Sequence, residues 1–377
     1  MHICFIEDTK LHGGTQIWVT EATKAFIDAG AKVTVLTPEA GWVGPRCKAI
    51  GAAIVSYDYE DVINENEKNR KIWAEGLRDA DVAICTVHPP RDGFHCSVFA
   101  SRVIREFGLQ TILIPKTGTI VPEYKREFYM PDEDAVSYVI AITDFTRRYL
   151  IDTYKIPAGR VELIYQGTEV DLFTRNEARN AEARKRYPLP PDASPLLGYA
   201  GSFEERKGLP ILLEAVAGAG QKFPNIHLML VGDGPDEVKL KQMVHEMHLD
   251  DNVSFFPFTS EPVYIFELID IIMLSSLYKE GLPNILLEAM SMELPVISSK
   301  LAGVPEIVKN GETGYMVEPG DIAGFSDAIS KLWSNKQAYG AMAANARSLM
   351  EARFDKKQQF KAFIHYFETI TARKGHN

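Results

Sequence analysis

The segment Glu280–Met290 carries two carboxylates at a spacing that suits ligand binding. Glu280 precedes a Gly-Leu-Pro turn, and Glu288 follows eight positions later in an apolar run. Asn284 and Glu288 are four positions apart and share one face of the expected helix, whose positively polarised start lies next to Glu280. A carboxylate among apolar residues needs a partner, and a vicinal diol that donates two hydrogen bonds is one. The alternative is an exposed helix glutamate.

A second polar loop, Gly201–Gly208, follows a short apolar run. It places Arg206 and Lys207 directly before a glycine. Arg offers a planar fork of donors and Lys a compact charge, so the pair could neutralise a diphosphate. A solvated turn is the alternative.

The adjacent glycines Gly13 and Gly14 come after the first apolar run of the chain. Two glycines let the backbone come close to a ligand, and the amides of the helix start that follows favour an anion or a hydroxyl-rich group. A plain tight turn is the alternative. The loop is not Gly-x-Gly-x-x-Gly, and Val231–Pro235 lacks the third glycine of that fingerprint, so neither supports a dinucleotide site.

These loops must be positioned by folded domains, and the sequence predicts two such domains. Short apolar runs alternate with amphipathic stretches in two series, which is typical of parallel sheets covered by helices on both faces. In such α/β sheets ligands bind at the carboxyl ends of strands, where the loops lie. We expect one domain over residues 1–172, a polar and then proline-rich linker over 173–195, and a second domain over 196–353. A helix over 354–377 returns to the first domain or packs on the second.

Composition excludes several classes of protein. With 377 residues, 46% hydrophobic and 24% charged, the chain is neither collagenous nor wholly disordered, and its net charge of −10 argues against a nucleic-acid partner. The acidic start does not resemble a secretory signal, and no apolar run approaches the ~20 residues of a membrane span. We expect a cytoplasmic protein with four reduced cysteines, and contact with a membrane surface stays open.

The order of the glycine, Arg-Lys and Glu-x7-Glu loops, followed by Ala302–Val308, resembles the retaining glycosyltransferases of family 4, which have the GT-B fold. The resemblance covers nearly the whole chain and is strongest from Gly198 to Asp321. It implies two Rossmann-like domains that face each other across a cleft. The N-terminal domain would bind the acceptor and the C-terminal domain the nucleotide sugar.

The resemblance also implies roles for individual residues. Glu288 would accept from the donor ribose hydroxyls, Lys207 and Arg206 would bind the diphosphate, and Glu280 would lie by the donor sugar. The expected catalytic residues are Lys207, Arg206, Glu280 and His88, the last of which ends an apolar run. The expected donor-binding residues are Gly13, Gly14, Lys116, Ser202, Gly281, Leu282, Asn284 and Glu288. Ser202 stands where the family often has Arg, and Lys116 where it often has His.

The function expected from this resemblance is transfer of a sugar, with retention, from a nucleoside diphosphate donor to a hydroxyl acceptor in glycan, glycolipid or small-glycoside biosynthesis. UDP is the first choice of nucleotide and GDP the second. No metal or other cofactor is expected, because Lys, Arg and helix dipoles can carry the leaving-group charge. Two alternatives are a nucleotide-sugar epimerase or phosphorylase of the same fold, and a non-catalytic sugar-nucleotide-binding protein.

Overall fold

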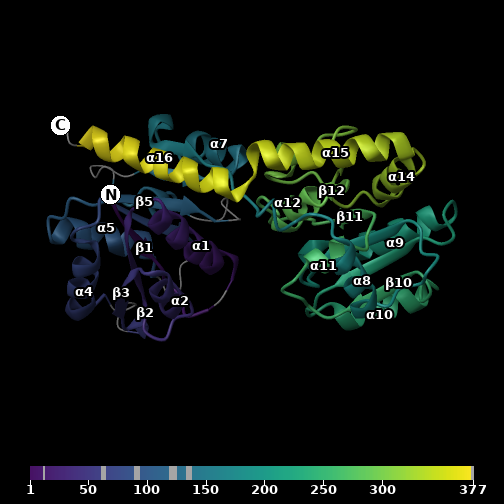
Figure 1. Cartoon of the computed structure of the whole chain (residues 1–377), viewed down its shortest axis with the longest axis horizontal. Coiled ribbons are helices and arrows are strands. Elements are labelled where there is room, and N and C mark those ends of the chain that lie inside the picture. The colour runs from purple at the N-terminus through teal and green to yellow at the C-terminus, as the bar shows by residue number, and fades with distance from the viewer. Residues whose placement is uncertain (12, 61–64, 89–93, 119–124, 133–137, 375–377) are drawn as a thin grey trace. The chain divides into compact units, whose positions relative to one another are not determined.

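The chain folds into two compact units. The computed structural model describes residues 1–377 apart from 12, 61–64, 89–93, 119–124, 133–137 and 375–377. One unit comprises Met1–Tyr165 and Gln358–Asn377, and the other comprises Gln166–Lys357. Each is a parallel sheet with helices packed against it (Figure 1), so the predicted class of two Rossmann-like α/β domains is confirmed.

The first unit contains a seven-stranded parallel sheet in the order β3-β2-β1-β4-β5-β6-β7. Its strands are β1 (His2–Ile6), β2 (Lys32–Pro38), β3 (Ala53–Tyr57), β4 (Val82–Val87), β5 (Ile112–Thr117), β6 (Val139–Ala141) and β7 (Val161–Leu163). Its helices are α1 (Gly14–Asp28), α2 (Val43–Ile50), α4 (Glu67–Leu77), α5 (Cys96–Glu106), α6 (Arg126–Tyr129), α7 (Asp144–Asp152) and most of α16 (Lys356–Lys374). The strand order reverses between β1 and β4, which is where a doubly wound sheet leaves a crevice.

Helix α16 completes the core of the first unit. Its Phe360, Phe363 and Phe367 are buried at the helical spacing of three and four residues. Phe363 contacts Trp18 of α1 at a ring-centroid distance of 5.3 Å, and Phe367 stacks on Phe26 at 5.6 Å. The last helix, yellow in Figure 1, therefore belongs to the same core as the first.

The second unit contains a six-stranded parallel sheet in the order β10-β9-β8-β11-β12-β13. Its strands are β8 (Leu196–Ala200), β9 (His227–Val231), β10 (Val253–Phe256), β11 (Ile271–Leu274), β12 (Val296–Ser299) and β13 (Gly314–Val317). Its helices are α8 (Glu177–Arg186), α9 (Leu209–Gly220), α10 (Glu237–Glu246), α11 (Val263–Phe266), α12 (Asn284–Ser291), α13 (Val304–Ile307), α14 (Ile322–Trp333) and α15 (Lys336–Arg353). The strand order reverses between β8 and β11.

The segment 173–195 differs from the expected linker. It contains α8, which packs on α11 within the second unit. Arg179 donates to the buried carboxylate of Glu267 at 2.7 Å, and the backbone N–H of Asn176 donates to the same oxygen at 2.9 Å. A buried carboxylate needs such partners, so this segment is fixed to its domain, and the first unit ends at Tyr165 rather than at 172.

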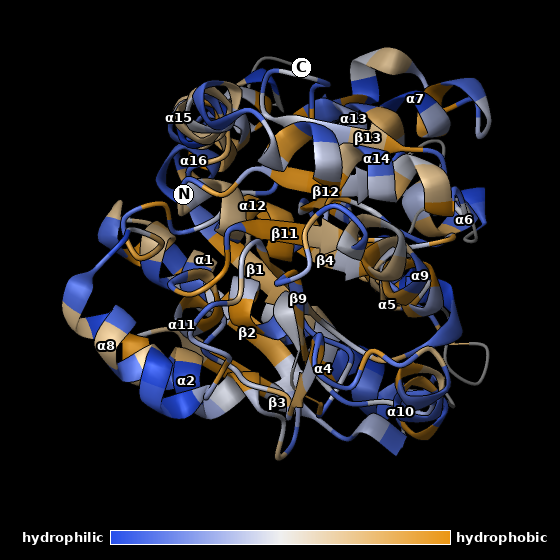
Figure 2. Ribbon diagram, turned by 90° about the vertical axis from the view of Figure 1, so that its right-hand side faces the viewer, coloured by the Kyte–Doolittle hydropathy of each residue, from blue (hydrophilic) through white to orange (hydrophobic). Residues whose placement is uncertain are grey.

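Hydropathy follows the layers. In Figure 2 the strands β2, β11 and β12 are largely orange, whereas the helices α2, α8 and α10 are largely blue. This is the pattern of sheets covered on both faces. Among the residues that the structure describes, no helix has the length and apolar character needed to cross a membrane.

Candidate nucleotide-sugar site

Two loops meet at the reversal point of the second sheet. One follows β8 and runs to Gly208, and the other follows β11 and begins at Ser275. The Ser275 hydroxyl lies 2.9 Å from the carbonyl oxygen of Lys207 and 3.0 Å from that of Gly208. Gly208 has φ +62°, and a Cβ there would lie 2.4 Å from the Ser275 carbonyl oxygen. The close approach of the two loops therefore requires glycine at position 208.

The side chains at this meeting point form a charged cluster. Lys207 Nζ pairs with Glu280 Oε1, and the Ser276 hydroxyl donates to the same oxygen at 2.6 Å. Arg206 Nη1 lies 3.7 Å from it. The structure therefore brings Arg206, Lys207 and Glu280 together in the second unit.

Arg206 has a second carboxylate partner, which sequence reasoning missed. Its Nε donates to Glu204 Oε2 at 2.8 Å. The pKa of Glu204 is lowered, first by a hydrogen bond from the side chain of Ser202 and then by the hydrogen bond from Arg206, while burial opposes the shift. Glu204 therefore belongs to the same charged group as Arg206.

Four predicted residues lie just before or within helix α12. Gly281 and Leu282 precede it, and Asn284 and Glu288 belong to it. Gly281 accepts a backbone hydrogen bond from Gly303 at 3.0 Å, and Leu282 is fully buried. Asn284 opens the helix with an exposed side chain whose Oδ1 accepts from Gln166 Nε2. Gln166, the first residue of the second unit, is thereby attached to the start of α12.

Glu288 lies one helical turn after Asn284 and is half-buried. Burial raises the pKa of Glu288 to about 7, against the opposing effect of Lys356. A freely exposed helix glutamate would keep its ordinary pKa, so that alternative does not describe the residue. A carboxylate poised between its two protonation states gains from any ligand that donates hydrogen bonds to it.

The first unit gathers buried polar groups at the carboxyl end of its own sheet. Lys116, at the end of β5, is 6% exposed, and its ammonium lies 4.4 Å from the ring centroid of Trp18. Burial lowers the pKa of Lys116 to about 8, and the negative charge of Glu7 opposes the shift. Glu7, directly after β1, accepts from Gln16 at 2.8 Å. Lys116 thus faces a buried carboxylate of its own unit.

Gly13 and Gly14 lie at the start of helix α1 and do not form a tight turn. Gly13 has an extended backbone with φ −172° and forms the N-cap of α1, and Gly14 is the first residue of that helix. Position 12 of this loop lies outside the described residues.

His88 follows β4 and is half-buried. His95, at the start of α5, is buried and stacks on Phe128 at 4.0 Å, and burial lowers its pKa to about 4.

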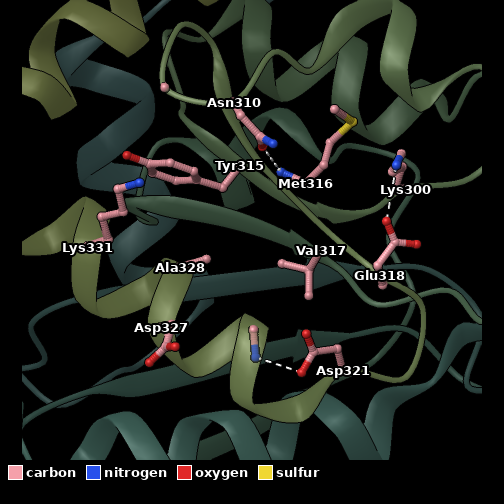
Figure 3. A pocket seen from close by; sticks show the side chains of 12 residues that line it. Lys300, Asn310, Tyr315, Met316, Val317, Glu318, Asp321, Asp327, Ala328 and Lys331 are labelled. Carbon is pink, nitrogen blue, oxygen red and sulfur yellow. Dashed lines mark hydrogen bonds and ion pairs between the residues drawn. The ribbon is translucent and has the colours of Figure 1, made fainter.

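A separate pocket of about 520 Å³ lies beside the edge strand β13 (Figure 3). In its lining Lys300 pairs with Glu318 at 3.1 Å, and Lys331 lies 4.8 Å from the ring centroid of Tyr315. Asn310 Oδ1 accepts from the backbone N–H of Met316 at 2.6 Å. None of the predicted site residues lines this pocket.

The structure adds Glu7, Glu204, Ser275 and Ser276 to the predicted residues. Glu7 follows β1, and the two serines follow β11. The rule that ligands bind at the carboxyl ends of parallel strands could therefore have selected these three from the sequence. Glu204 carries no such signal, because its role appears only through its contact with Arg206.

Comparison with known proteins gives consistent matches. Residues 180–349 match the model of the family described as glycosyl transferases group 1. The chain is 30% identical over 219 residues to an alpha-D-kanosaminyltransferase of Streptomyces kanamyceticus, covering 57% of this chain and 56% of that protein. It is 27% identical over 229 residues to a GDP-mannose-dependent alpha-(1-6)-phosphatidylinositol monomannoside mannosyltransferase of Mycobacterium tuberculosis, covering 59% of each. The chain thus spans less than two thirds of the length of either relative.

The fold of the whole chain also has a solved counterpart. The crystal structure of Anabaena Alr3699/HepE in complex with UDP superimposes with a TM-score of 0.83 at 19% identity, covering 98% of this chain and 100% of that one. At this identity the likeness concerns the fold.

Proposed function

We propose that this chain is a glycosyltransferase that transfers a sugar from a nucleoside diphosphate donor to a hydroxyl group of an acceptor. The match of residues 180–349 to the glycosyl transferases of group 1, the glycosyltransferase relatives and the GT-B fold support this proposal. The observation that supports this most is the charged cluster of the second unit. Arg206 and Lys207 meet Glu280 at the reversal point of the sheet, where open α/β sheets bind their ligands.

In the proposed reaction the acceptor oxygen forms a bond to the anomeric carbon as the bond from that carbon to the diphosphate breaks. The attack takes place on the same face, so the configuration is retained, and an oxygen of the departing diphosphate takes the acceptor proton. Lys207 and Arg206 stabilise the charge that develops on the leaving group, and Glu280 lies by the sugar. Glu288 accepts from the ribose hydroxyls, and the backbone of Gly281 and Leu282 and the side chain of Asn284 complete the donor site.

Since the side chains of Lys207 and Arg206 supply the positive charge at the diphosphate, we propose that no metal is needed.

UDP is the proposed nucleotide, and the UDP complex of the structural neighbour supports it. GDP is second, supported by the GDP-mannose-dependent relative. The proposed acceptor is a hydroxyl-bearing glycan, glycolipid or small glycoside. In the first unit, Gly13, Gly14 and Lys116 are proposed to bind the donor, and His88 is proposed as a catalytic residue.

Nucleotide binding is the direct test of this function. Thermal unfolding of the protein is measured with UDP, GDP, ADP and CDP; a ligand present at 100 times its Kd should stabilise by about 2.7 kcal/mol. The preferred nucleotide then selects the sugar donors for a transfer assay with EDTA, and NMR of the product reads the anomeric configuration. Absence of stabilisation by every nucleotide would contradict the proposal, and an inverted product would contradict retention.

The same assay separates the two alternatives. An epimerase would convert the sugar donor without an acceptor. A phosphorylase would transfer the sugar to or from inorganic phosphate and would release no nucleotide. A non-catalytic binding protein would bind the donor and release no sugar in the presence of any acceptor.

A further inference from the structure

Arg206 presents different edges of its guanidinium to two carboxylates. Its Nε donates to Glu204 at 2.8 Å, whereas its Nη1 lies 3.7 Å from Glu280 Oε1 and 3.5 Å from the carbonyl oxygen of Lys279. Glu204 therefore holds the guanidinium by the nitrogen nearest the aliphatic stem. The terminal nitrogens lie toward Glu280, the carboxylate that also pairs with Lys207.

The backbone of Glu204 is fixed by the turn that follows it. It is extended, directly before the 3₁₀ turn Glu205–Lys207, and its carbonyl accepts from the N–H of Lys207 at 2.9 Å. Glu204 and Arg206 thus lie two residues apart in one hydrogen-bonded turn, and their side chains contact each other.

We propose that Glu204 is a positioning residue that aims the terminal nitrogens of Arg206 at the diphosphate of the donor. This inference rests on the proposed function. A free arginine side chain loses rotamer freedom when it binds a phosphate, and a carboxylate that fixes its Nε in advance reduces that loss. Because Arg carries donors on Nε and on both Nη atoms, it can hold Glu204 and a phosphate together.

The opposite role for Glu204 would be that of an internal anion which competes with the diphosphate. Competition would require Glu204 to occupy the terminal nitrogens of Arg206, but its contact is to Nε. The terminal nitrogen Nη1 instead lies toward Glu280. The geometry therefore favours positioning, and the two roles predict opposite changes in affinity.

A double-mutant cycle tests the proposal. Titration calorimetry measures the Kd of the tightest-binding nucleoside diphosphate, and of its nucleoside, for wild type, Glu204→Ala, Arg206→Ala and the double variant. We expect Glu204→Ala to weaken diphosphate binding about five- to tenfold, to leave nucleoside binding unchanged, and to cause no further loss when Arg206 is already absent. Glu204→Gln keeps an oxygen for Nε and should restore most of the affinity.

Glu205→Ala is the matched control, because Glu205 is the exposed neighbour and its removal changes the charge equally. It should leave the diphosphate Kd within about twofold of wild type. Tighter binding by Glu204→Ala, or equal losses with and without Arg206, would overturn the positioning role while leaving the proposed function intact. Failure of the wild type to bind any nucleoside diphosphate would overturn both. Should Glu204→Ala not fold, the cycle with Glu204→Gln and Glu204→Asp decides: equal affinities of these two would overturn the proposal.

Discussion

Lys207 and Glu280 form an ion pair that joins the loop after β8 to the loop after β11, with 14% and 9% of their side chains exposed. Neither charge is well solvated, so each depends on the other in the free protein. A diphosphate that binds Lys207 must replace or share this partner, and the hydroxyl of Ser276 then remains as a donor to Glu280.

Replacing Lys207 by Ala should weaken nucleoside diphosphate binding by roughly 1.5 to 3 kcal/mol, the contribution of a charge-assisted contact, with a smaller effect on the nucleoside. Titration calorimetry with UDP and uridine measures both. Equal losses for the two ligands would show that Lys207 does not contact the phosphates.

Replacing Glu288 by Gln should weaken donor binding by about 1 to 3 kcal/mol, because one acceptor oxygen becomes a donor. The loss should be smaller for a 2′,3′-dideoxy analogue, which has no ribose hydroxyls to offer. The Kd values of both proteins for both ligands form a double cycle. Glu293→Gln, at an exposed position, is the control. Additive effects in the cycle would mean that Glu288 does not hold the ribose.

Binding of the donor should release protons near pH 6 to 7. The pKa of Glu288 is raised from 4.5 to about 7 by burial, so much of this group is protonated in the free protein, and hydrogen bonds from the ribose favour its ionised form. Calorimetry in buffers of different ionisation enthalpy counts the protons, and Glu288→Gln should abolish the Glu288 contribution. Proton uptake would contradict the assignment.

The raised pKa of Glu288 also makes the stability of the protein depend on pH. Between the unfolded pKa and about 7 the folded state binds more protons than the unfolded state, so the stability contributed by neutral Glu288 is lost as pH rises through that range. The free energy of unfolding of wild type, measured in urea, should therefore fall relative to that of Glu288→Gln between pH 5 and pH 8.

Replacing Gly208 by Ala should destabilise the second unit and reduce nucleotide binding. The new Cβ would lie 2.4 Å from the Ser275 carbonyl oxygen, so the two loops would have to separate. Gly311→Ala is the control, because Gly311 also has a positive φ, of +81°, but has nothing within 4 Å of the new Cβ. Urea unfolding should show a loss of about 1 kcal/mol for the control and a larger loss for Gly208→Ala. Equal losses would mean that the contact with Ser275 is relieved at no cost.

Replacing Phe363 by Ala should destabilise the first unit by about 3 to 5 kcal/mol, because the ring is fully buried against Trp18. Phe258→Ala, at a position 66% exposed, should stay within about 0.5 kcal/mol of wild type. Tryptophan fluorescence during urea unfolding reports on the first unit, which holds Trp18, Trp42 and Trp73 of the four tryptophans. A small effect of Phe363→Ala would show that α16 contributes little to this core.

Sequence reasoning gave most of the fold because buried parallel strands are continuous apolar runs. Val82–Val87 and Ile271–Leu274, for example, are largely apolar runs of the sequence and are buried strands in the structure. The strands β3 and β13 lie at the edges of their sheets, and their half-buried middle residues give a weaker pattern. The composition of segment 173–195 is polar and predicted a linker. In the structure its Arg179 side chain and Asn176 backbone N–H instead donate to the buried carboxylate of Glu267.

The site was predictable in part for a related reason. Arg206, Lys207 and Glu280 stand directly in loops after strands, so topology alone brings them together. The contact of Glu204 with Arg206 depends on rotamers within a short turn, and the burial of Lys116 over Trp18 depends on how α1 packs. Such relations between side chains arise from tertiary packing, which no local pattern encodes.

The return of α16 has a consequence for the order in which the protein can fold during synthesis. Phe363 and Phe367 are translated after the whole of the second unit, yet they cover Trp18 and Phe26 near the beginning of the chain. On the ribosome the second unit can therefore finish its core while the first, though made earlier, still exposes aromatic surface. The nascent first unit must wait for more than 190 residues to pass before its last aromatic contacts form.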